Sequence, residues 1–292
     1  MQKERRKSAS SAGATVRGPK PSAPPMGSSA VRRIIETIEQ CEGDPDFMTS
    51  FARGLAVLRA FTGHTRVLSV SQISLQIGIP RAAVRRALYT MLRLGYVSET
   101  DGGYCLQPRV LGIGNAYLSS ATLAQMAQPV LDALRDRVQE SCSLGVLDED
   151  EALYVARAQT VRIISVGLHP GSRIPAYCSS LGRMLLAHLP EAELETYLAR
   201  VAMRPRTDRT VVERARLRTL LEKARRSGYC IVDQELELGL RSVAVPVRSA
   251  KGEVVAAINI GTSSAQATLR KLETELLPQL RVAAMQLESL LQ

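Results

Sequence analysis

Apolar residues recur at helical spacing in three consecutive stretches near the start of the chain, residues 47–61, 70–77 and 81–94. Gly78 is placed to end the second predicted helix, and Pro80 suits the start of the third. The residues that follow, YVSETDGGYCLQ, form two strand-like runs around a glycine-containing turn and predict a hairpin. Within residues 44–107, this order of helix, short helix, turn, longer helix and hairpin predicts a winged helix-turn-helix.

The pattern changes after residue 141, where strand-like runs alternate with helical ones. The strand-like runs lie at 142–159, 161–168, 229–235 and 241–260, with a loop expected at 169–180. Helices are predicted between them and at the C-terminal end, where Pro278 is expected to kink the helix over 265–291. Strands paired in hairpins with helices set to one side favour an α+β fold class over a doubly wound parallel sheet.

These patterns divide the chain into four segments. Residues 1–43 are expected to be a disordered basic tail that could hold one short helix at 31–42. Residues 44–107 are the winged helix-turn-helix domain, residues 108–122 a linker helix, and residues 123–292 a second, α+β domain. The first helix of the second domain carries an apolar stripe, which is expected to pack against a partner helix and so to join the domains or form a dimer contact.

Charge is distributed unevenly along the chain. Of the net charge of +10, residues 48–120 carry +6, from eight Arg against Glu99 and Asp101. A compact, arginine-only basic segment is typical of a nucleic-acid module, although charge alone is equally consistent with a solvated basic face.

The third predicted helix is the one that enters the major groove in a winged helix-turn-helix. Arg81 and Arg85 are four residues apart, share one face, and lie near the helix N-terminus, from which side chains reach base edges. We therefore expect these two arginines to read guanine in double-stranded operator DNA. The expected DNA-contacting set is Ser71, Gln72, Arg81, Arg85, Arg86 and Tyr89.

Several protein classes are disfavoured by the sequence. No apolar run approaches the roughly 20 residues of a membrane helix, and no apolar stretch follows the basic N-terminus as in a signal peptide. The five cysteines are widely spaced and never form CxxC, which argues against disulfides or zinc and for the reducing cytoplasm. A metal is not expected, since the three histidines show no HExxH motif or paired spacing. A cofactor is not expected either, since GxGxxG and P-loop motifs are missing from the sequence.

Enzyme activity is also disfavoured. The acidic run Asp148, Glu149, Asp150, Glu151 is expected to be a solvated turn, and His188 lies among leucines as a structural histidine would. The SSLG sequence is not a GxSxG nucleophile elbow. A sensor that acts through protein contacts alone, without DNA, is a further alternative, against which the exposed arginines of the third helix argue.

Four long stretches of the chain resemble the IclR family of bacterial transcription regulators, and within it the aromatic-acid branch of PcaR, PcaU and PobR type. The matching stretches are DPDFMTSFARGLAVLRAF (44–61), SVSQISLQIGIPRAAVRRALYTMLRLGYV (69–97), RIPAYCSSLGRMLLA (173–187) and DQELELGLRSVAVPV (233–247). The resemblance covers about residues 44–290.

The resemblance implies a GAF-like effector-binding domain after the winged helix, and assembly into homodimers or dimers of dimers. It implies activation of β-ketoadipate-pathway genes by a small aromatic acid or a β-ketoadipate-like dicarboxylate, with RNA polymerase as a further partner. An IclR-type repressor, or a regulator that senses a different small carboxylate, is the alternative.

The resemblance also implies the position of the effector site. It maps to Tyr177, Cys178 and Ser179 on one side and to Asp233, Ser242, Asn259 and Gly261 on the other, with Arg157 and Arg162 as candidates to face a carboxylate. The polar loop before the helix at 181–189 would offer free N–H groups to an anion. Taken without the family, these residues favour a structural role over a binding site, with Ser179 and Ser180 capping the helix, Cys178 in the core, and Asp233, Glu235 and Glu237 on a solvated strand edge.

Overall fold

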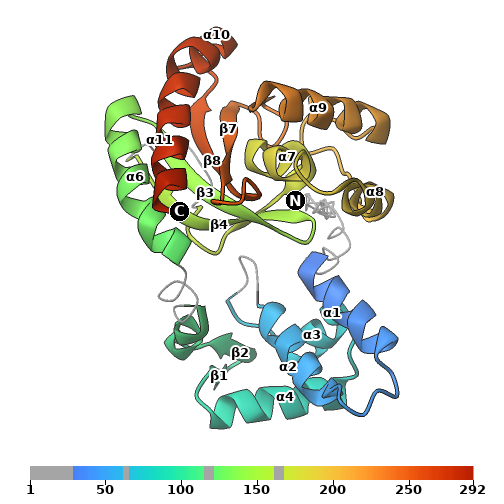
Figure 1. The fold of residues 1–292 in the computed structure, drawn as a ribbon. Helices are drawn as coiled ribbons and strands as arrows, with labels where there is room; N and C mark the ends of the chain where they lie inside the picture. The colour runs from blue at the N-terminus through green and yellow to red at the C-terminus, as the bar shows by residue number, and fades with distance from the viewer. Residues whose placement is uncertain (1–28, 62–65, 115–121, 161–167, 292) are drawn as a thin grey trace, which may run out of the picture.

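The computed structural model describes residues 29–61, 66–114, 122–160 and 168–291. Residues 1–28 of the predicted tail, the end of the predicted linker helix and nearly all of the strand predicted at 161–168 lie outside these ranges. The described residues form an N-terminal unit of helices with a small hairpin and a C-terminal unit built on a six-stranded sheet (Figure 1).

Four helices build the N-terminal unit, α1 (Ser29–Gln40), α2 (Thr49–Arg59), α3 (Val70–Ile77) and α4 (Arg81–Arg93). Their apolar faces meet in one core that includes Ile73, Ile77, Val84 and Leu88, the residues that the helical spacing placed inward. Val31 of α1 is buried in the same core. The predicted domain boundary at residue 44 therefore lies inside this unit, because α1 is one of its helices.

Local capping chemistry sets the helix-turn-helix geometry. Ser69 and Gln72 form a reciprocal capping box at the start of α3, and Gly78 ends the helix in the left-handed conformation. Strands β1 (Val97–Thr100) and β2 (Gly103–Leu106) then form the antiparallel wing. A side chain at Gly103 would collide with the Leu68 carbonyl, because β2 passes directly beside that residue.

The segment between the units begins as a short helix. The turn η1 (Pro108–Val110) continues in helical conformation to residue 114, and α6 (Thr122–Val138) opens the second unit. The apolar stripe of α6 packs on its own sheet and on the C-terminal helix, so the expected partner helix lies within the same unit. The expected dimer contact stays a prediction. The stripe consists of Leu123, Val130, Leu131, Leu134 and Val138.

The sheet of the C-terminal unit is antiparallel with the strand order β5-β4-β3-β8-β7-β6. The first four residues of the predicted loop at 169–180 precede a short edge strand, so this segment is partly regular. The strands are β3 (Ser141–Asp148), β4 (Glu151–Ala158), β5 (Arg173–Pro175), β6 (Cys230–Asp233), β7 (Leu240–Arg248) and β8 (Val254–Ser263).

Helices cover both faces of the sheet, as Figure 1 shows. Helix α6 packs with α11 (Leu277–Leu290) on one face, and α7 (Ser180–Leu186), α8 (Glu191–Arg200) and α9 (Arg214–Ser227) lie on the other. The mixed helix and sheet class is as predicted, but the helices are not confined to one side. Three short helical segments complete the unit: η2 (Ala176–Cys178), α10 (Leu269–Lys271) and the π-helical η3 (Leu272–Leu276). The irregularity of the C-terminal helical region therefore lies just before Pro278, where the kink was expected.

Among the helices that the structure describes, none combines the length and apolar character needed to cross a bilayer.

Candidate functional site

Helix α4 presents an exposed polar face opposite its buried one. Arg81, Arg85, Arg86 and Tyr89 are all exposed, while Val84 and Leu88 are fully buried against α2 and α3. Their positions match the prediction for a recognition helix whose arginines are available to an external partner.

At the start of α3, one of the two predicted DNA-contacting residues is already engaged in a hydrogen bond. Ser71 is exposed, but the Gln72 side chain accepts a hydrogen bond from the Ser69 backbone at 2.8 Å as part of the capping box. A DNA contact by Gln72 therefore competes with its structural role.

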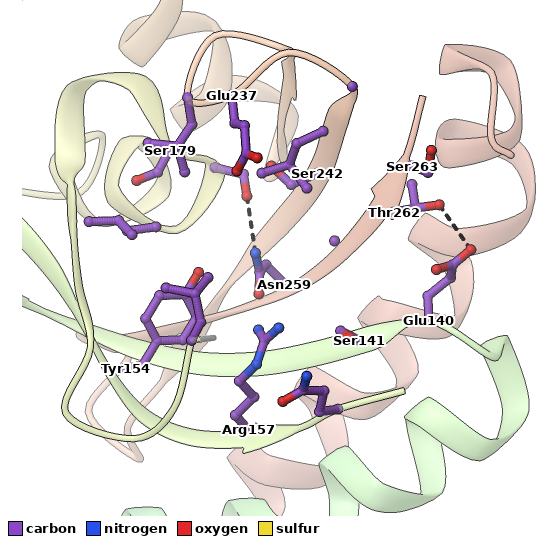
Figure 2. A pocket seen from close by; sticks show the side chains of 18 of the residues that line it. Glu140, Ser141, Tyr154, Arg157, Ser179, Glu237, Ser242, Asn259, Thr262 and Ser263 are labelled. Carbon is purple, nitrogen blue, oxygen red and sulfur yellow. Dashed lines mark hydrogen bonds between the residues drawn. The ribbon is translucent and has the colours of Figure 1, made fainter. Parts of the chain in front are cut away.

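The C-terminal unit holds a cavity of about 570 Å³ between the sheet and the start of α7. Figure 2 shows side chains from the sheet strands, α7 and the loop before β7 pointing into it. The loop at 236–240 and Arg206 also line the cavity, and Thr262 Oγ1 donates a hydrogen bond to Glu140 Oε1 at 2.9 Å in its wall.

Three polar residues of the cavity region form one row across neighbouring strands. Ser143 of β3 pairs with Arg157 of β4 on one side and with Asn259 of β8 on the other. Arg157 Nη1 donates to Ser143 Oγ at 2.8 Å, and Asn259 Nδ2 donates to Ser180 Oγ at 3.4 Å. In Figure 2 the Arg157 guanidinium points from β4 toward Asn259.

A β-bulge brings Arg157 to the same side of the sheet as Tyr154. Leu144 pairs with Ala156 but the next residue, Gly145, pairs with Tyr154, so Val155 is the extra residue. Strict alternation along β4 would send the two side chains to opposite faces. With the bulge, both line the cavity, and the Arg157 guanidinium lies 5.8 Å from the centre of the Tyr154 ring.

Two buried polar atoms of the cavity have no hydrogen-bond partner among the residues that the structure describes. They are Arg157 Nε, a donor, and Asn259 Oδ1, an acceptor. Burial lowers the pKa of Arg157 and raises the pKa of Tyr154 to about 12, so the tyrosine is a neutral phenol at pH 7. A buried unpaired polar group costs about 1–3 kcal/mol, so a ligand that satisfies these atoms gains that energy.

The structure brings five of the eight predicted effector residues together. Arg157, Ser179, Ser242, Asn259 and Gly261 line the cavity. Arg162 lies outside the described residues.

Three predicted effector residues do not line the cavity. The Tyr177 hydroxyl is held by the backbone of Arg204, donating to its carbonyl at 2.6 Å, and Cys178 is a core residue. Burial raises the pKa of the Cys178 thiol to about 11. Asp233 lies on the edge strand β6, where it forms ion pairs with Arg209 and Arg241.

The N-terminus of α7, beside the cavity, is already capped. Ser179 Oγ accepts a hydrogen bond from the Gly182 backbone at 3.2 Å, so the capping role considered for Ser179 exists alongside its place in the cavity wall. The expectation that free helix N–H groups hold an anion is therefore not met at Gly182. A side chain at Gly182 would overlap Ala176, since α7 packs tightly on η2.

A buried ion pair anchors the loop that closes the cavity. Arg183 of α7 is 2% exposed and binds both carboxylate oxygens of Glu235, at 2.6 and 2.5 Å. Glu235 Oε2 also accepts from the Val211 backbone at 2.9 Å. The expectation of a solvated edge is wrong for Glu235, because its side chain turns inward. An arginine inside the apolar run LGRMLLA was the sequence signal for this pair.

His188 has the structural role that the sequence predicted. Its Nδ1 lies 2.9 Å from the Met184 carbonyl, and Arg248 donates to its Nε2 at 3.2 Å. Because arginine can only donate, the imidazole is neutral with its proton on Nδ1. Burial, supported by the charges of Arg248 and Arg225, lowers the pKa of His188.

The acidic turn between β3 and β4 is not the solvated turn that the sequence predicted. All four of its side chains are only partly exposed. Arg173 of β5 binds both Asp148 and Glu151, and Arg200 of α8 binds Asp150 at 2.7 Å. Arginines from other elements therefore pair with three of its four acids. In the part of the chain that the structure describes, no group of His, Cys, Asp and Glu side chains is arranged to hold a metal.

Family models match both units of the chain. Residues 50–101 match the IclR helix-turn-helix domain, and residues 115–289 match the bacterial transcriptional regulator IclR C-terminal domain.

Individual relatives match over most of their length. The chain is 47% identical to the Pca regulon regulatory protein of Pseudomonas putida, covering 90% of this chain and 89% of that protein. It is 34% identical to the p-hydroxybenzoate hydroxylase transcriptional activator of Acinetobacter baylyi, with 84% and 92% covered. A solved IclR homolog complexed with 4-hydroxybenzoate, from Microbacterium hydrocarbonoxydans, is 28% identical with a TM-score of 0.69, covering 83% and 98%.

Proposed function

Because this chain belongs to the IclR family of bacterial transcriptional regulators, we propose that it controls genes of aromatic-acid catabolism in response to a small acid bound in the C-terminal cavity. The regulator binds operator DNA through α4, and the acid changes that binding or its transcriptional effect. Transcription from a catabolic promoter, with and without the acid, is the readout of this function.

The pair of unsatisfied polar atoms in the cavity carries the proposal for the ligand. Arg157 Nε requires an acceptor and Asn259 Oδ1 requires a donor. A hydroxylated aromatic acid supplies both, through its carboxylate and its hydroxyl group. The Tyr154 ring and the apolar cavity wall suit the aromatic ring.

A ring-opened dicarboxylate of the β-ketoadipate kind is the second candidate ligand. Arg173 and Arg206 also line the cavity, so it offers cations beyond Arg157 for a second carboxylate. Such a ligand leaves Asn259 Oδ1 without a donor, which favours the hydroxylated aromatic acid.

The names of the relatives support the same ligand class. One relative regulates the Pca regulon, another activates p-hydroxybenzoate hydroxylase transcription, and a third was solved with 4-hydroxybenzoate. We extend this chemistry to the present chain, whose cavity has complementary groups.

Operator binding by a homodimer, alone or as a dimer of dimers, fits the N-terminal unit. Arg81 and Arg85 are exposed at the start of α4, where a recognition helix contacts bases. On α2 and just before it, Met48, Phe51 and Leu55 form an exposed apolar stripe at helical spacing. Pairing this stripe with a second copy buries it and presents two recognition helices to a palindromic site.

We further propose that the protein is an activator that works in the cytoplasm and contacts RNA polymerase at the promoter. An activator in this family links bound acid to expression of the enzymes that degrade it. A repressor, or a regulator of another carboxylate, is distinguished by the direction of the transcriptional response and by the ligand screen.

The test is a thermal-shift screen combined with a promoter gel shift. The panel contains 4-hydroxybenzoate, 3,4-dihydroxybenzoate, benzoate and β-ketoadipate. A ligand at 100 times its Kd stabilises the folded state by about 2.7 kcal/mol, which corresponds to a shift of roughly 5–10 °C for a unit of this size. If no member shifts the melt at millimolar concentration, the aromatic-acid assignment is wrong, and if the promoter fragment is not shifted, the operator-binding assignment is wrong.

A further inference from the structure

The β3–β4 hairpin lines the cavity along β4, and its turn faces the N-terminal unit. Glu151, Tyr154 and Arg157 of β4 line the cavity. The turn of the hairpin is centred on Glu149, which adopts a positive φ of 61°. In Figure 1 the end of this hairpin lies beside α1, across the gap between the two units.

Two cations of the N-terminal unit act electrostatically on Glu149. Its Oε2 is buried and has no hydrogen-bond partner among the residues described. Burial raises the pKa of Glu149, while the charges of Arg59 at the end of α2 and Arg33 of α1 act in the opposite direction. Both arginines thus lie within electrostatic reach of this carboxylate, although neither is within ion-pair distance.

Arg173 links this turn to the cavity. Its side chain lines the cavity and binds Asp148 and Glu151, which flank Glu149 in the turn. Burial, and after it the positive charge of Arg59, lowers the pKa of Arg173. Arg59 is therefore attracted by Glu149 and repelled by Arg173, so the charge at Arg173 influences how firmly the two units hold together.

We propose that Arg173 and the acidic β3–β4 turn couple the effector cavity to the DNA-binding unit through Arg59 and Arg33. A carboxylate bound in the cavity beside Arg173 adds negative charge there and so weakens the repulsion between Arg173 and Arg59. The acidic turn then attracts Arg59 and Arg33 more strongly, and the two units dock more tightly. This inference rests on the proposed binding of an acid in the same cavity.

Coupling of this kind is reciprocal. If the acid favours the docked arrangement, it changes operator affinity by the same factor by which operator DNA changes the affinity for the acid. The acid shifts the equilibrium only by its differential affinity for the two arrangements, and Arg173 supplies that difference here.

The first experiment measures amide hydrogen exchange of the full chain without ligand, in the peptides that cover α2 and the β3–β4 turn. Arg173→Gln, which removes the positive charge that repels Arg59, is expected to slow exchange about 5-fold, the lower end of typical allosteric coupling. Glu149→Arg is expected to speed it, and the charge-swapped pair Glu149→Arg with Arg59→Glu to return it toward the wild-type rate. Glu253→Arg is the matched control, because Glu253 is an exposed acid at the β7–β8 hairpin turn.

The second experiment adds 4-hydroxybenzoate and measures operator affinity. Wild type and Glu253→Arg are expected to show the same ratio of Kd with and without the acid, while Glu149→Arg brings this ratio close to 1 and the charge-swapped pair restores it. Unchanged exchange in both Arg173→Gln and Glu149→Arg overturns the inference, as does a charge-swapped pair that behaves like the single variants. If the acid does not bind wild type, the proposed function fails, and the ligand-free exchange rates still decide this coupling.

Discussion

Arg157 on β4 and Asn259 on β8 lie in the same lateral row of the sheet, separated by Ser143 on the strand between them. Arg157 and Asn259 both line the cavity, and each retains one buried polar atom without a hydrogen-bond partner among the described residues. One is a donor and the other an acceptor, so we expect the row to favour ligands that carry both kinds of group. Effector specificity is then expected to follow from strand register as much as from residue type.

Arg157→Ala is expected to weaken binding of 4-hydroxybenzoate about 10- to 100-fold, because a hydrogen bond to a charged group contributes about 1.5–3 kcal/mol. Isothermal titration calorimetry measures the change. The neutral analogue 4-hydroxybenzamide lacks the carboxylate, so its affinity is expected to fall much less. An equal loss for both ligands would show that Arg157 supports the cavity wall rather than the carboxylate.

Asn259→Ala addresses the acceptor of the same row. In wild type, 4-hydroxybenzoate is expected to bind more tightly than benzoate, since only the former offers a donor to Asn259 Oδ1. In the variant the two acids are expected to bind with similar affinity. If Asn259→Ala still binds 4-hydroxybenzoate in full preference to benzoate, Asn259 Oδ1 is not the acceptor of the ligand hydroxyl. The hydroxyl then donates to another group of the cavity.

The recognition helix gives a prediction that is independent of the cavity. Arg81→Ala and Arg85→Ala are each expected to cost about 1–3 kcal/mol of specific operator binding and to relax sequence preference. Both side chains are exposed, so the melting temperature is expected to stay unchanged. Arg226→Ala on α9 is the matched control, an exposed arginine in the other unit. Operator binding at the wild-type level in both α4 variants would falsify the assignment of this helix.

The helices and the wing were predictable because their signals are local. The capping box of Ser69 and Gln72, the left-handed Gly78 and the apolar spacing of Val84 and Leu88 all act within a few residues of each other. The same locality explains the correct interpretation of His188, whose partner Met184 is one helical turn away.

The cavity depends on contacts that sequence spacing does not reveal. A bulge at Val155 brings Tyr154 and Arg157 to one face, and the pairing of β3 with β8 brings Asn259 beside Ser143. Alternation along a single strand cannot detect either. Glu235 was misassigned to a solvated edge because its partner, Arg183, is 52 residues away in the chain.

Removal of one partner of the Arg183–Glu235 pair is expected to destabilise the folded protein strongly. Arg183→Met leaves the Glu235 carboxylate in the core without its arginine, at a cost of about 3–5 kcal/mol. Adding Glu235→Gln removes the buried charge and keeps an acceptor for the Val211 amide, so the double variant is expected to recover part of the loss. Urea unfolding monitored by circular dichroism measures the free energies.

Effector affinity provides the second readout for this pair. Glu235 anchors the loop at 236–240, which lines the cavity, so Glu235→Gln is expected to weaken 4-hydroxybenzoate binding as well as stability. If the affinity of folded Glu235→Gln matches that of wild type, the loop is positioned by Thr207 and Thr210 alone.

The lowered pKa of His188 predicts how the free energy of unfolding depends on pH between 7.5 and 5.5. Burial, followed by the charges of Arg248 and Arg225, lowers its pKa in the folded protein below the ordinary value of about 6.5. The unfolded chain then binds more protons than the folded one in this range, so His188 makes the free energy of unfolding fall as the pH falls through the unfolded-state pKa. His188→Gln keeps an acceptor for Arg248 without a titrating group, and is expected to flatten this part of the profile.

Urea unfolding at pH 7.5, 6.5 and 5.5 measures the free energy of unfolding, with His169→Gln as the control for an exposed histidine. A slope that stays the same in His188→Gln, or that changes equally in His169→Gln, shows that the His188–Arg248 contact does not set the pH response.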